Sequence, residues 1–258
     1  MHDMLKRIVA HKKEEVKQLK QSAYQRHKKA SDKSLPMRNF SQALLQKTPA
    51  VIAEIKRASP SRGLICQNFD VVNITKAYAA NQASCISVLT DAHFFQGHND
   101  FLPMAKAACT LPVLRKDFII DEHQITESLL LGADCILLIA AILDNHQLHD
   151  FCVQALELNM QVLVESHTEA ELERALALPT PLIGINNRNL ADFSVDLKRS
   201  ITLAERIPQD RIIITESGIH SAEDIKHLQA HRIQAFLIGE TLMKAADCGA
   251  KLREILTI

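Results

Sequence analysis

The 258-residue chain contains no tryptophan, only 7 glycines and 4% aromatic residues, and its net charge is zero. A balanced charge argues against nucleic-acid binding, which leaves a basic footprint. The longest uncharged apolar run, from Cys135 to Leu143, is far shorter than the roughly 20 residues that span a bilayer. The first residues also lack the apolar stretch of a signal peptide. These absences predict a cytoplasmic protein that binds neither nucleic acid nor a membrane.

The six cysteines are irregularly spaced and form no CxxC pair. This excludes a disulfide scaffold and a structural zinc site, and it fits a reduced compartment. Cys85 and Cys135 lie inside apolar segments, where a buried thiol is inert. His146 and His149 have the helical spacing of a chelating pair, but they fall on a predicted surface helix without a third ligand. His167 also lacks convergent ligands, so no metal is expected.

The N-terminal segment differs from the rest in charge, because residues 1–34 carry ten Lys/Arg against four Asp/Glu. Apolar residues recur there at three- and four-residue steps, which is typical of an amphipathic helix. They are Leu5, Ile8, Val9, Val16 and Leu19. Such a helix could be an arm for nucleic acid or membrane, but the lack of interleaved aromatics favours a peripheral helix with a narrow apolar seam and a solvated basic face. A break at Ser34–Pro36 then precedes a short helix over Phe40–Leu45.

From residue 50 onward, eight short apolar runs alternate with segments of helical periodicity. The predicted strands are Val51–Ile55, Cys85–Leu89, Pro112–Leu114, Cys135–Ile139, Gln161–Val164, Leu182–Ile185, Arg211–Ile214 and Ala235–Ile238. Helices are predicted over Asp144–Leu158, Thr168–Leu176, Ser194–Arg206 and Ser221–Ala230. Strands and helices that alternate in this way form right-handed βαβ units with a parallel sheet.

Eight such units predict an α/β fold, a closed (β/α)8 TIM barrel. The structural alternative is an open doubly wound sheet, but the first strand lacks the GxGxxG turn of a dinucleotide-binding fold. With only 7 glycines, a glycine-rich cofactor cradle is also unexpected. We expect a single domain over residues 1–258, in which residues 1–47 form an N-terminal helical extension.

Polar side chains stand at the ends of five predicted strands, where barrels carry their chemistry. They are Glu54 and Lys56, Lys116, Glu165, Asn186, and Glu216 with Ser217. Because strand residues alternate between faces, Glu54 and Lys56 point the same way, and the other three charged side chains turn into the barrel. Each alone could be an ordinary surface charge. Together they would be costly to desolvate unless paired, and paired groups can act as acid and base near neutral pH.

A phosphate site is predicted in the loops after the last two strands, where barrels commonly bind phosphate through backbone N–H groups. These loops read Glu216–Ile219 and Ile238–Thr241, and each holds a glycine that lets the backbone approach a ligand. Alternatively, Gly218 and Gly239 serve only as helix-entry turns. The Glu240 carboxylate would repel phosphate unless it points away.

Several segments resemble the indole-3-glycerol-phosphate synthase family, barrel enzymes of tryptophan biosynthesis. The resemblance rests on Ala53–Gly63, which reads AEIKRASPSRG, and on Ser87–Asp91 with Phe95–Gly97, Leu114–Ile119, Leu130–Asp134, Val162–Glu165, Ile183–Arg188, Glu216–Ile219 and Leu237–Glu240. It covers nearly the whole chain, including the N-terminal helix, which in this family lies across the barrel mouth. Asp91-Ala92-His93 replaces the family's common Glu-Pro-x, which predicts a less rigid loop. The chain ends soon after the eighth strand, so no fused isomerase domain is expected.

The resemblance implies conversion of 1-(2-carboxyphenylamino)-1-deoxyribulose 5-phosphate into indole-3-glycerol phosphate, with loss of carbon dioxide and water. It implies no metal or organic cofactor. Lys116 matches the general acid at the ketose carbonyl, and Glu165 matches the acid/base carboxylate of dehydration. Lys56, paired with Glu54, matches a substrate-holding lysine that could also donate a proton. Asn186 and Ser217 match positioning groups, and the choice of lysine for each step stays open.

The same resemblance implies the substrate contacts. The polar surround is Ser59, Pro60, Arg188 and Glu216, and the apolar pocket around the aromatic ring is Phe95, Phe118 and Leu137. The phosphate is expected at Lys56, Gly218, Gly239 and the Glu240 backbone. The expected partner is a small phosphorylated substrate, and the chain is expected to be a monomer with at most transient contact with other tryptophan-pathway enzymes.

Two rival functions remain on the sequence alone. One is another phosphosugar-binding barrel, such as a phosphoribosylanthranilate isomerase, whose chemistry is expected to use a cysteine at the end of the first strand. This chain carries Glu54 and Lys56 there. The other is a non-catalytic barrel that binds a sugar phosphate unchanged, which a product assay would distinguish.

Overall fold

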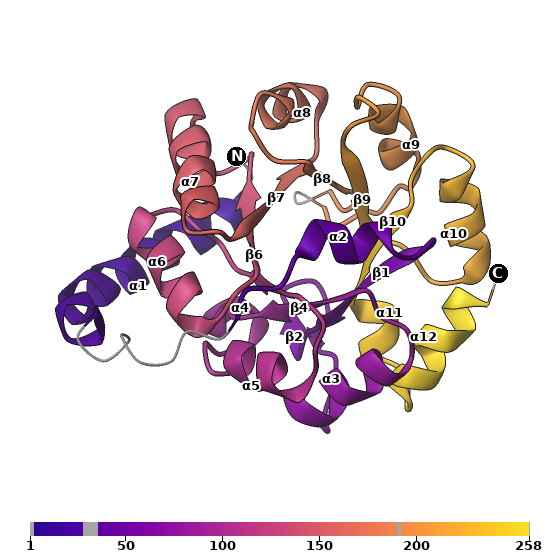
Figure 1. Ribbon diagram of the computed structural model, residues 1–258, viewed down its shortest axis with the longest axis horizontal. Coiled ribbons are helices and arrows are strands. Elements are labelled where there is room, and N and C mark those ends of the chain that lie inside the picture. Colours follow the sequence, from indigo (N-terminus) through magenta and orange to yellow (C-terminus); the bar gives the residue numbers. More distant parts are fainter. Residues whose placement is uncertain (1–2, 28–35, 190–191, 258) are drawn as a thin grey trace.

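The computed structural model describes residues 3–27, 36–189 and 192–257, and its centre is a closed barrel of parallel strands (Figure 1). Around the barrel the strands run in the order β1-β10-β9-β8-β7-β6-β5-β4. Their bounds are β1 Ala50–Ile55, β4 Cys85–Leu89, β5 Val113–Lys116, β6 Cys135–Ile139, β7 Gln161–Ser166, β8 Leu182–Asn186, β9 Ile212–Glu216 and β10 Ala235–Ile238. All neighbouring pairs are parallel, so the carboxyl ends of all eight strands meet at one mouth. The predicted TIM barrel is confirmed.

Helices surround the barrel on its outer face (Figure 1). Their bounds are α3 Val71–Ala80, α4 Ala92–Phe95, α5 Phe101–Ala108, α6 Glu122–Leu131, α7 Asn145–Glu157, α8 Glu169–Leu176, α9 Lys198–Ala204, α10 Ala222–Gln229, α11 Glu240–Met243 and α12 Cys248–Leu256. The side chains of Asp144, Thr168 and Ser221 cap α7, α8 and α10 by accepting a backbone N–H three residues on, which fixes where these helices begin. The prediction for α9 was too long, because Val195 pairs with Arg188 in an isolated antiparallel bridge before the helix starts.

The barrel interior is filled below the mouth. Inward side chains such as Leu114, Leu163 and Ile214 form one buried cluster, while Val51, Ala53 and Ile55 pack outward against the helices. The short helix α2, Phe40–Leu45, adds Phe40 and Leu44 to the inner cluster. Because apolar side chains occupy the barrel below, the open end of the barrel is the place where its polar residues gather.

The polar residues at the mouth belong to the strands themselves. Lys116, Asn186 and Glu216 are the last residues of β5, β8 and β9, and Glu165 lies within β7. The predicted strands ended one or two residues too early at these points. The backbone of each polar residue is therefore fixed by the sheet rather than by a loop. A hairpin of β2, Ala58–Ser59, and β3, Gly63–Leu64, follows β1 and was not predicted.

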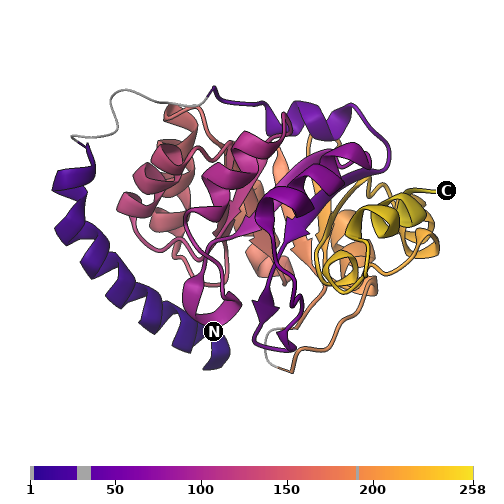
Figure 2. The same cartoon turned by 90° about the horizontal axis from the view of Figure 1, so that it is seen from below.

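The N-terminal helix α1, Asp3–His27, runs along one side of the barrel and brings its first turns to the mouth (Figure 2). Its buried seam is Leu5, Ile8, Lys12 and Val16. The predicted amphipathic helix is present, and Lys6, Lys13 and Lys17 on its basic face are exposed. Lys12 is the exception, because it lies on the buried seam. The predicted break at Ser34–Pro36 lies largely outside the described residues. Within the described ranges, no helix is long and apolar enough to cross a membrane.

Candidate active site

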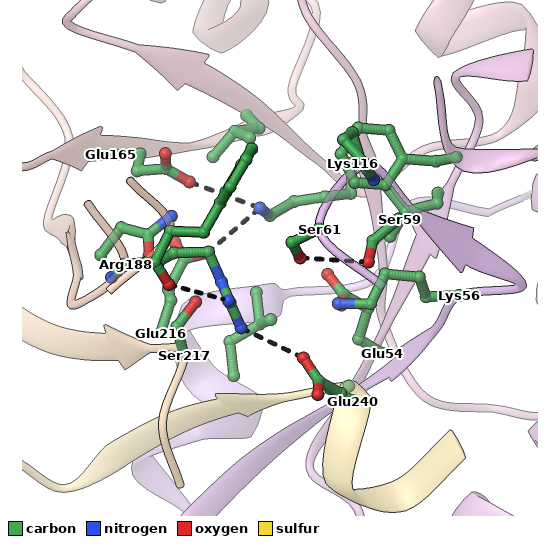
Figure 3. A pocket seen from close by; sticks show the side chains of 18 of the residues that line it. Glu54, Lys56, Ser59, Ser61, Lys116, Glu165, Arg188, Glu216, Ser217 and Glu240 are labelled. Atoms are coloured by element: carbon green, nitrogen blue, oxygen red, sulfur yellow. Dashed lines mark hydrogen bonds and ion pairs between the residues drawn. The ribbon is translucent and has the colours of Figure 1, made fainter. Parts of the chain in front are cut away.

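The sixteen predicted site residues line one pocket at the barrel mouth (Figure 3). They are Glu54, Lys56, Ser59, Pro60, Phe95, Lys116, Phe118, Leu137, Glu165, Asn186, Arg188, Glu216, Ser217, Gly218, Gly239 and Glu240. The strand ends contribute most of the charged groups, and the loops that follow contribute the rest. The fold thus brings together residues from both halves of the chain.

Lys116 lies between two carboxylates in this pocket. Its Nζ is 3.3 Å from Glu165 Oε2 and 3.1 Å from Glu216 Oε2. Burial disfavours the charge on Lys116, but Glu216 and Glu165 more than offset this and raise its pKa above the usual value. The ammonium is therefore present at neutral pH, where it can donate a proton to a bound carbonyl.

The two carboxylates beside Lys116 differ in acidity. Burial raises the pKa of Glu216 to about 7 even though Lys116 acts in the opposite direction. Burial also favours the neutral form of Glu165, but Lys116 and His167 outweigh it and lower the pKa of Glu165 below its ordinary value. One ammonium thus separates an ionised carboxylate from one that titrates near neutrality. Neighbouring groups with diverging pKa values are typical of acid/base sites.

Lys56 and Glu54 form a second ion pair at the end of β1, with 2.6 Å between Nζ and Oε2. A Cβ atom at position 239 would collide with the Glu54 carboxylate, so Gly239 makes room for this pair. Gly218 has φ of +84° and no space for a side chain, because a Cβ there would collide with Val195. Packing alone therefore requires glycine at both positions, whether or not their backbones also bind a phosphate.

Glu240 is surrounded by cations. Its Oε1 is 3.0 Å from Arg62 Nε and 2.6 Å from Lys244 Nζ, and its Oε2 is 3.1 Å from Arg188 Nη2 (Figure 3). Burial would raise the pKa of Glu240, but these three cations hold it below the usual value. The Glu240 carboxylate was expected to repel phosphate unless it pointed away. It is ionised, and these three cations compensate its negative charge.

Part of the pocket lining is apolar. The rings of Phe95 and Phe118 lie 5.9 Å apart, centre to centre, and Leu137 lines the same pocket. Helix α1 adds Met4, Leu5 and Ile8, which were not predicted as pocket residues. These side chains give an aromatic substrate ring a hydrophobic surface in the same pocket as the charged groups.

Asn186, Ser217 and Ser59 supply uncharged polar groups. Asn186 Oδ1 accepts the backbone N–H of Arg188 at 3.0 Å, which fixes the loop after β8. Ser217 follows β9 with φ of 69°, in the left-handed region that a serine rarely adopts. Ser59 Oγ lies 3.4 Å from Ser61 Oγ in the hairpin. Strained backbone such as that of Ser217 clusters at functional sites.

Two charged side chains near the site were not predicted to belong to it. Lys12 Nζ lies 2.9 Å from both Asp91 Oδ2 and Asp117 Oδ1. The sequence feature that could have indicated its burial is its position on the apolar stripe of α1. His167, considered above only as a metal ligand, has Nε2 3.5 Å from Glu165 Oε1. The side chain of Asp91 caps α4 by accepting the Phe94 N–H at 2.7 Å, in the loop that was predicted to be less rigid.

The described part of the chain contains no group of three or more His, Cys, Asp or Glu side chains that could hold a metal ion. His146 and His149 are exposed on α7. Burial raises the pKa of the Cys85 and Cys135 thiols well above the usual value, which agrees with the predicted inertness of both.

Solved structures of other proteins have a similar barrel. A KGPDC from Streptococcus mutans has a TM-score of 0.63 at 11% identity and covers 81% of this chain and 96% of its own. A 3-hexulose-6-phosphate synthase has a TM-score of 0.62 at 17% identity, over 80% of this chain and 97% of its own. At such low identity these structures show the fold alone.

Sequence comparisons are more specific. The family model described as indole-3-glycerol phosphate synthase matches residues 5–255. An indole-3-glycerol phosphate synthase of Legionella pneumophila (strain Paris) is 58% identical over 258 residues, which is 100% of both chains. Another from Polaromonas naphthalenivorans (strain CJ2) is 49% identical over 260 residues and 99% of both chains. The chain therefore belongs to the indole-3-glycerol phosphate synthase family.

Proposed function

We propose that the barrel mouth closes the indole ring of 1-(2-carboxyphenylamino)-1-deoxyribulose 5-phosphate by acid/base catalysis, with Lys116 as the acid and Glu165 as the base. Membership of the family makes the chain a carboxy-lyase of tryptophan biosynthesis that forms indole-3-glycerol phosphate. The observation that supports these residue roles is the Lys116 ammonium between the carboxylates of Glu165 and Glu216.

The first step is ring closure. The ring carbon that bears the carboxylate attacks the ketose carbonyl carbon, and Lys116 gives a proton to the carbonyl oxygen as the carbon–carbon bond forms. Loss of carbon dioxide then returns the bonding pair to the ring and restores its aromaticity. A positioned general acid contributes about 100-fold or more to such a step. Glu216 and Glu165 keep Lys116 charged, so the proton is available at neutral pH.

The second step is loss of water. The new hydroxyl leaves with a proton from an acid, and the carbon between it and the nitrogen gives a proton to a base. Glu165 is the candidate base, because its lowered pKa keeps it ionised. Lys56 is one candidate acid for the departing hydroxyl. Lys116 is the other, provided that it has first regained the proton that it gave to the carbonyl oxygen.

Both ends of the flexible substrate are held away from the reacting atoms. Lys56 and the backbone of Gly218, Gly239 and Glu240 hold the phosphate, and the apolar wall holds the aromatic ring. Ser59, Pro60 and Arg188 complete the polar surround, while Asn186 and Ser217 position the reacting groups. Holding the reacting carbons in contact supplies several kcal/mol of the rate enhancement. No metal or organic cofactor takes part in this proposal.

The partner is a small phosphorylated ketose, and nucleic acid and membranes have no part in the reaction. We expect the chain to act as a monomer in the cytoplasm, with at most transient contact with other enzymes of the pathway. Sedimentation of the purified protein would check its oligomeric state.

The function can be tested through the absence of tryptophan, because an indole product fluoresces against little protein background. Purified protein is mixed with the carboxyphenylamino-deoxyribulose phosphate, and indole emission is followed with Lys116→Met as the control. Emission that grows with the wild type and not with the variant supports both the reaction and its acid. A folded wild type that binds the compound without emission would instead be a non-catalytic phosphosugar-binding barrel.

A further inference from the structure

His167 lies beside the oxygen of Glu165 that Lys116 does not contact. Its Nε2 is 3.5 Å from Glu165 Oε1, whereas Glu165 Oε2 is 3.3 Å from Lys116 Nζ. On the other side of the imidazole, Nδ1 is 3.3 Å from Glu171 Oε2. The same Glu171 oxygen accepts the backbone N–H of His167 at 2.7 Å. The ring is thus held between a catalytic carboxylate and a carboxylate of α8.

The position of His167 Nε2 calls for an explanation. The side chain of His167 is only 10% exposed, and Nε2 is buried without a hydrogen-bond partner among the described residues. A buried polar atom without a partner costs free energy. This atom faces Glu165, so a proton on Glu165 would give it a donor.

Turnover would produce such a proton. On the proposed function, Glu165 takes one proton from the substrate during dehydration. Its side chain is 4% exposed and faces a pocket that the substrate fills, so bulk water has little access to it until the product leaves. Glu165 must lose this proton before the next turnover, so a group beside it has to accept the proton.

We propose that His167 accepts this proton from Glu165 and holds it until the product leaves, with Glu171 stabilising the resulting imidazolium. The O–H bond of Glu165 breaks, an N–H bond forms at Nε2, and Nδ1–H remains donated to Glu171. The proton passes to water after the pocket opens, and His167 is again neutral. His167 does not touch the substrate in this scheme and is a positioning residue that acts through Glu165. The inference rests on the proposed role of Glu165 as the base.

The electrostatics of the cluster agree with this direction of transfer. Three carboxylates face His167, namely Glu165 of β7, Glu171 of α8 and Glu216 of β9, and Lys116 is the cation on the far side of Glu165. Burial disfavours the imidazolium, but Glu171 and Glu165 outweigh it and raise the pKa of His167 above its ordinary 6.5. Because only the neutral ring can accept a proton, kcat should rise with pH through the pKa of His167.

The test is the pH dependence of kcat in Glu171→Gln. The amide oxygen can still accept the His167 backbone N–H, but the negative charge that raises the pKa of His167 is gone. We expect the acidic limb of the profile to move down by about one pH unit. Glu169→Gln is the matched control, since Glu169 lies on the same helix and pairs with Arg206 instead. Glu216, the third carboxylate near the ring, is kept in the wild type and in both variants. An acidic limb that does not move in Glu171→Gln would overturn the proposal.

A second variant separates proton transfer from packing. His167→Gln should lower kcat by about tenfold or more, and added imidazole should restore part of the loss. A structural role would lower kcat without rescue, and a normal kcat would leave no role for the ring. Either result would overturn the proposal.

A measurement without substrate keeps this inference separate from the proposed function. NMR titration of the histidine rings should give a pKa above 6.5 for His167 in the wild type and a lower one in Glu171→Gln. A wild type that forms no indole product refutes the proposed function, and with it the proton source. Indole formation combined with a His167 pKa that is insensitive to Glu171 refutes the further inference alone.

Discussion

The ammonium of Lys12 lies 2.9 Å from the carboxylate of Asp117, the residue that directly follows Lys116. The same ammonium is 2.9 Å from Asp91, and the Lys12 side chain is only 3% exposed. Burial opposes its charge, but Asp117 and Asp91 more than compensate and raise the pKa of Lys12 above the usual value. Helix α1 is therefore fastened by a buried ion cluster to the loops after β4 and β5, next to the proposed acid.

Lys12→Met should destabilise the protein strongly. It leaves Asp91 and Asp117 buried without their ammonium, and removal of one partner from a buried ion pair costs about 3–5 kcal/mol. The free energy of unfolding, measured in urea, should fall by this amount. Lys13→Met is the control, because Lys13 is exposed on the same helix and its loss should change stability by less than about 0.5 kcal/mol. Equal effects of the two variants would contradict the role given to the buried cluster.

Lys116→Met should lower kcat by about 100-fold or more, because the proposed acid for the ketose carbonyl is lost. Indole emission under saturating substrate measures this loss, and circular dichroism checks that the variant is folded. Lys56→Met is the matched comparison and should mainly raise KM if Lys56 holds the phosphate. A near-normal kcat in Lys116→Met together with a large loss in Lys56→Met would transfer the role of acid to Lys56.

The parts of the site that lie on strands could be predicted from the sequence. Alternation along β1 places Ala53 and Ile55 against the outer helices, and this alone directs Glu54 and Lys56 into the mouth. The same rule holds for Lys116, which follows the inward Leu114 at two residues' distance. A strand fixes the direction of its side chains locally, so no knowledge of the rest of the fold is needed.

The parts that depend on contacts between distant elements could not be predicted in this way. Lys12 and Asp117 are far apart in sequence, and a lysine on a basic helix is usually solvated. Local turns were also not predicted in detail. His167 is two residues from Glu165 and was noted, but its contact with Glu171, four residues on, depends on how the chain turns from β7 into α8. The late start of α9 has a similar cause, since Val195 pairs with Arg188 instead of extending the helix.

Gly239→Ala should lower catalytic activity, although it adds only a methyl group. The added Cβ would collide with the Glu54 carboxylate, which must move and release its contact with Lys56. We expect kcat/KM to fall by about 100-fold, since a displacement of about 1 Å can have that effect. Gly63→Ala is the control, because its φ of +66° is strained but its Cβ would meet nothing within 4 Å. It should lose stability and keep most of its activity, and an equally inactive Gly63→Ala would contradict the argument.

Glu216→Gln should change how stability depends on pH. Burial raises the pKa of Glu216 from its ordinary 4.5 to about 7, so the folded protein binds this proton more tightly than the unfolded chain does. The contribution of Glu216 to stability is therefore fully present below pH 4.5 and is lost as the pH rises toward 7. Within that window the loss approaches about 1.4 kcal/mol for each pH unit.

Glutamine cannot titrate, so the stability of Glu216→Gln does not contain the decrease with pH that Glu216 causes in the wild type. The free energy of unfolding of the wild type minus that of Glu216→Gln should fall between about pH 5 and pH 7 and level off above it. Urea unfolding of both proteins at several pH values measures the difference, and other titrating groups cancel to the extent that the substitution leaves them unchanged. A difference that rises with pH would mean that the attraction of Lys116 outweighs burial and that Glu216 is ionised throughout. In that case Lys116 would lie between two permanent anions, and Glu216 could not exchange a proton near neutrality.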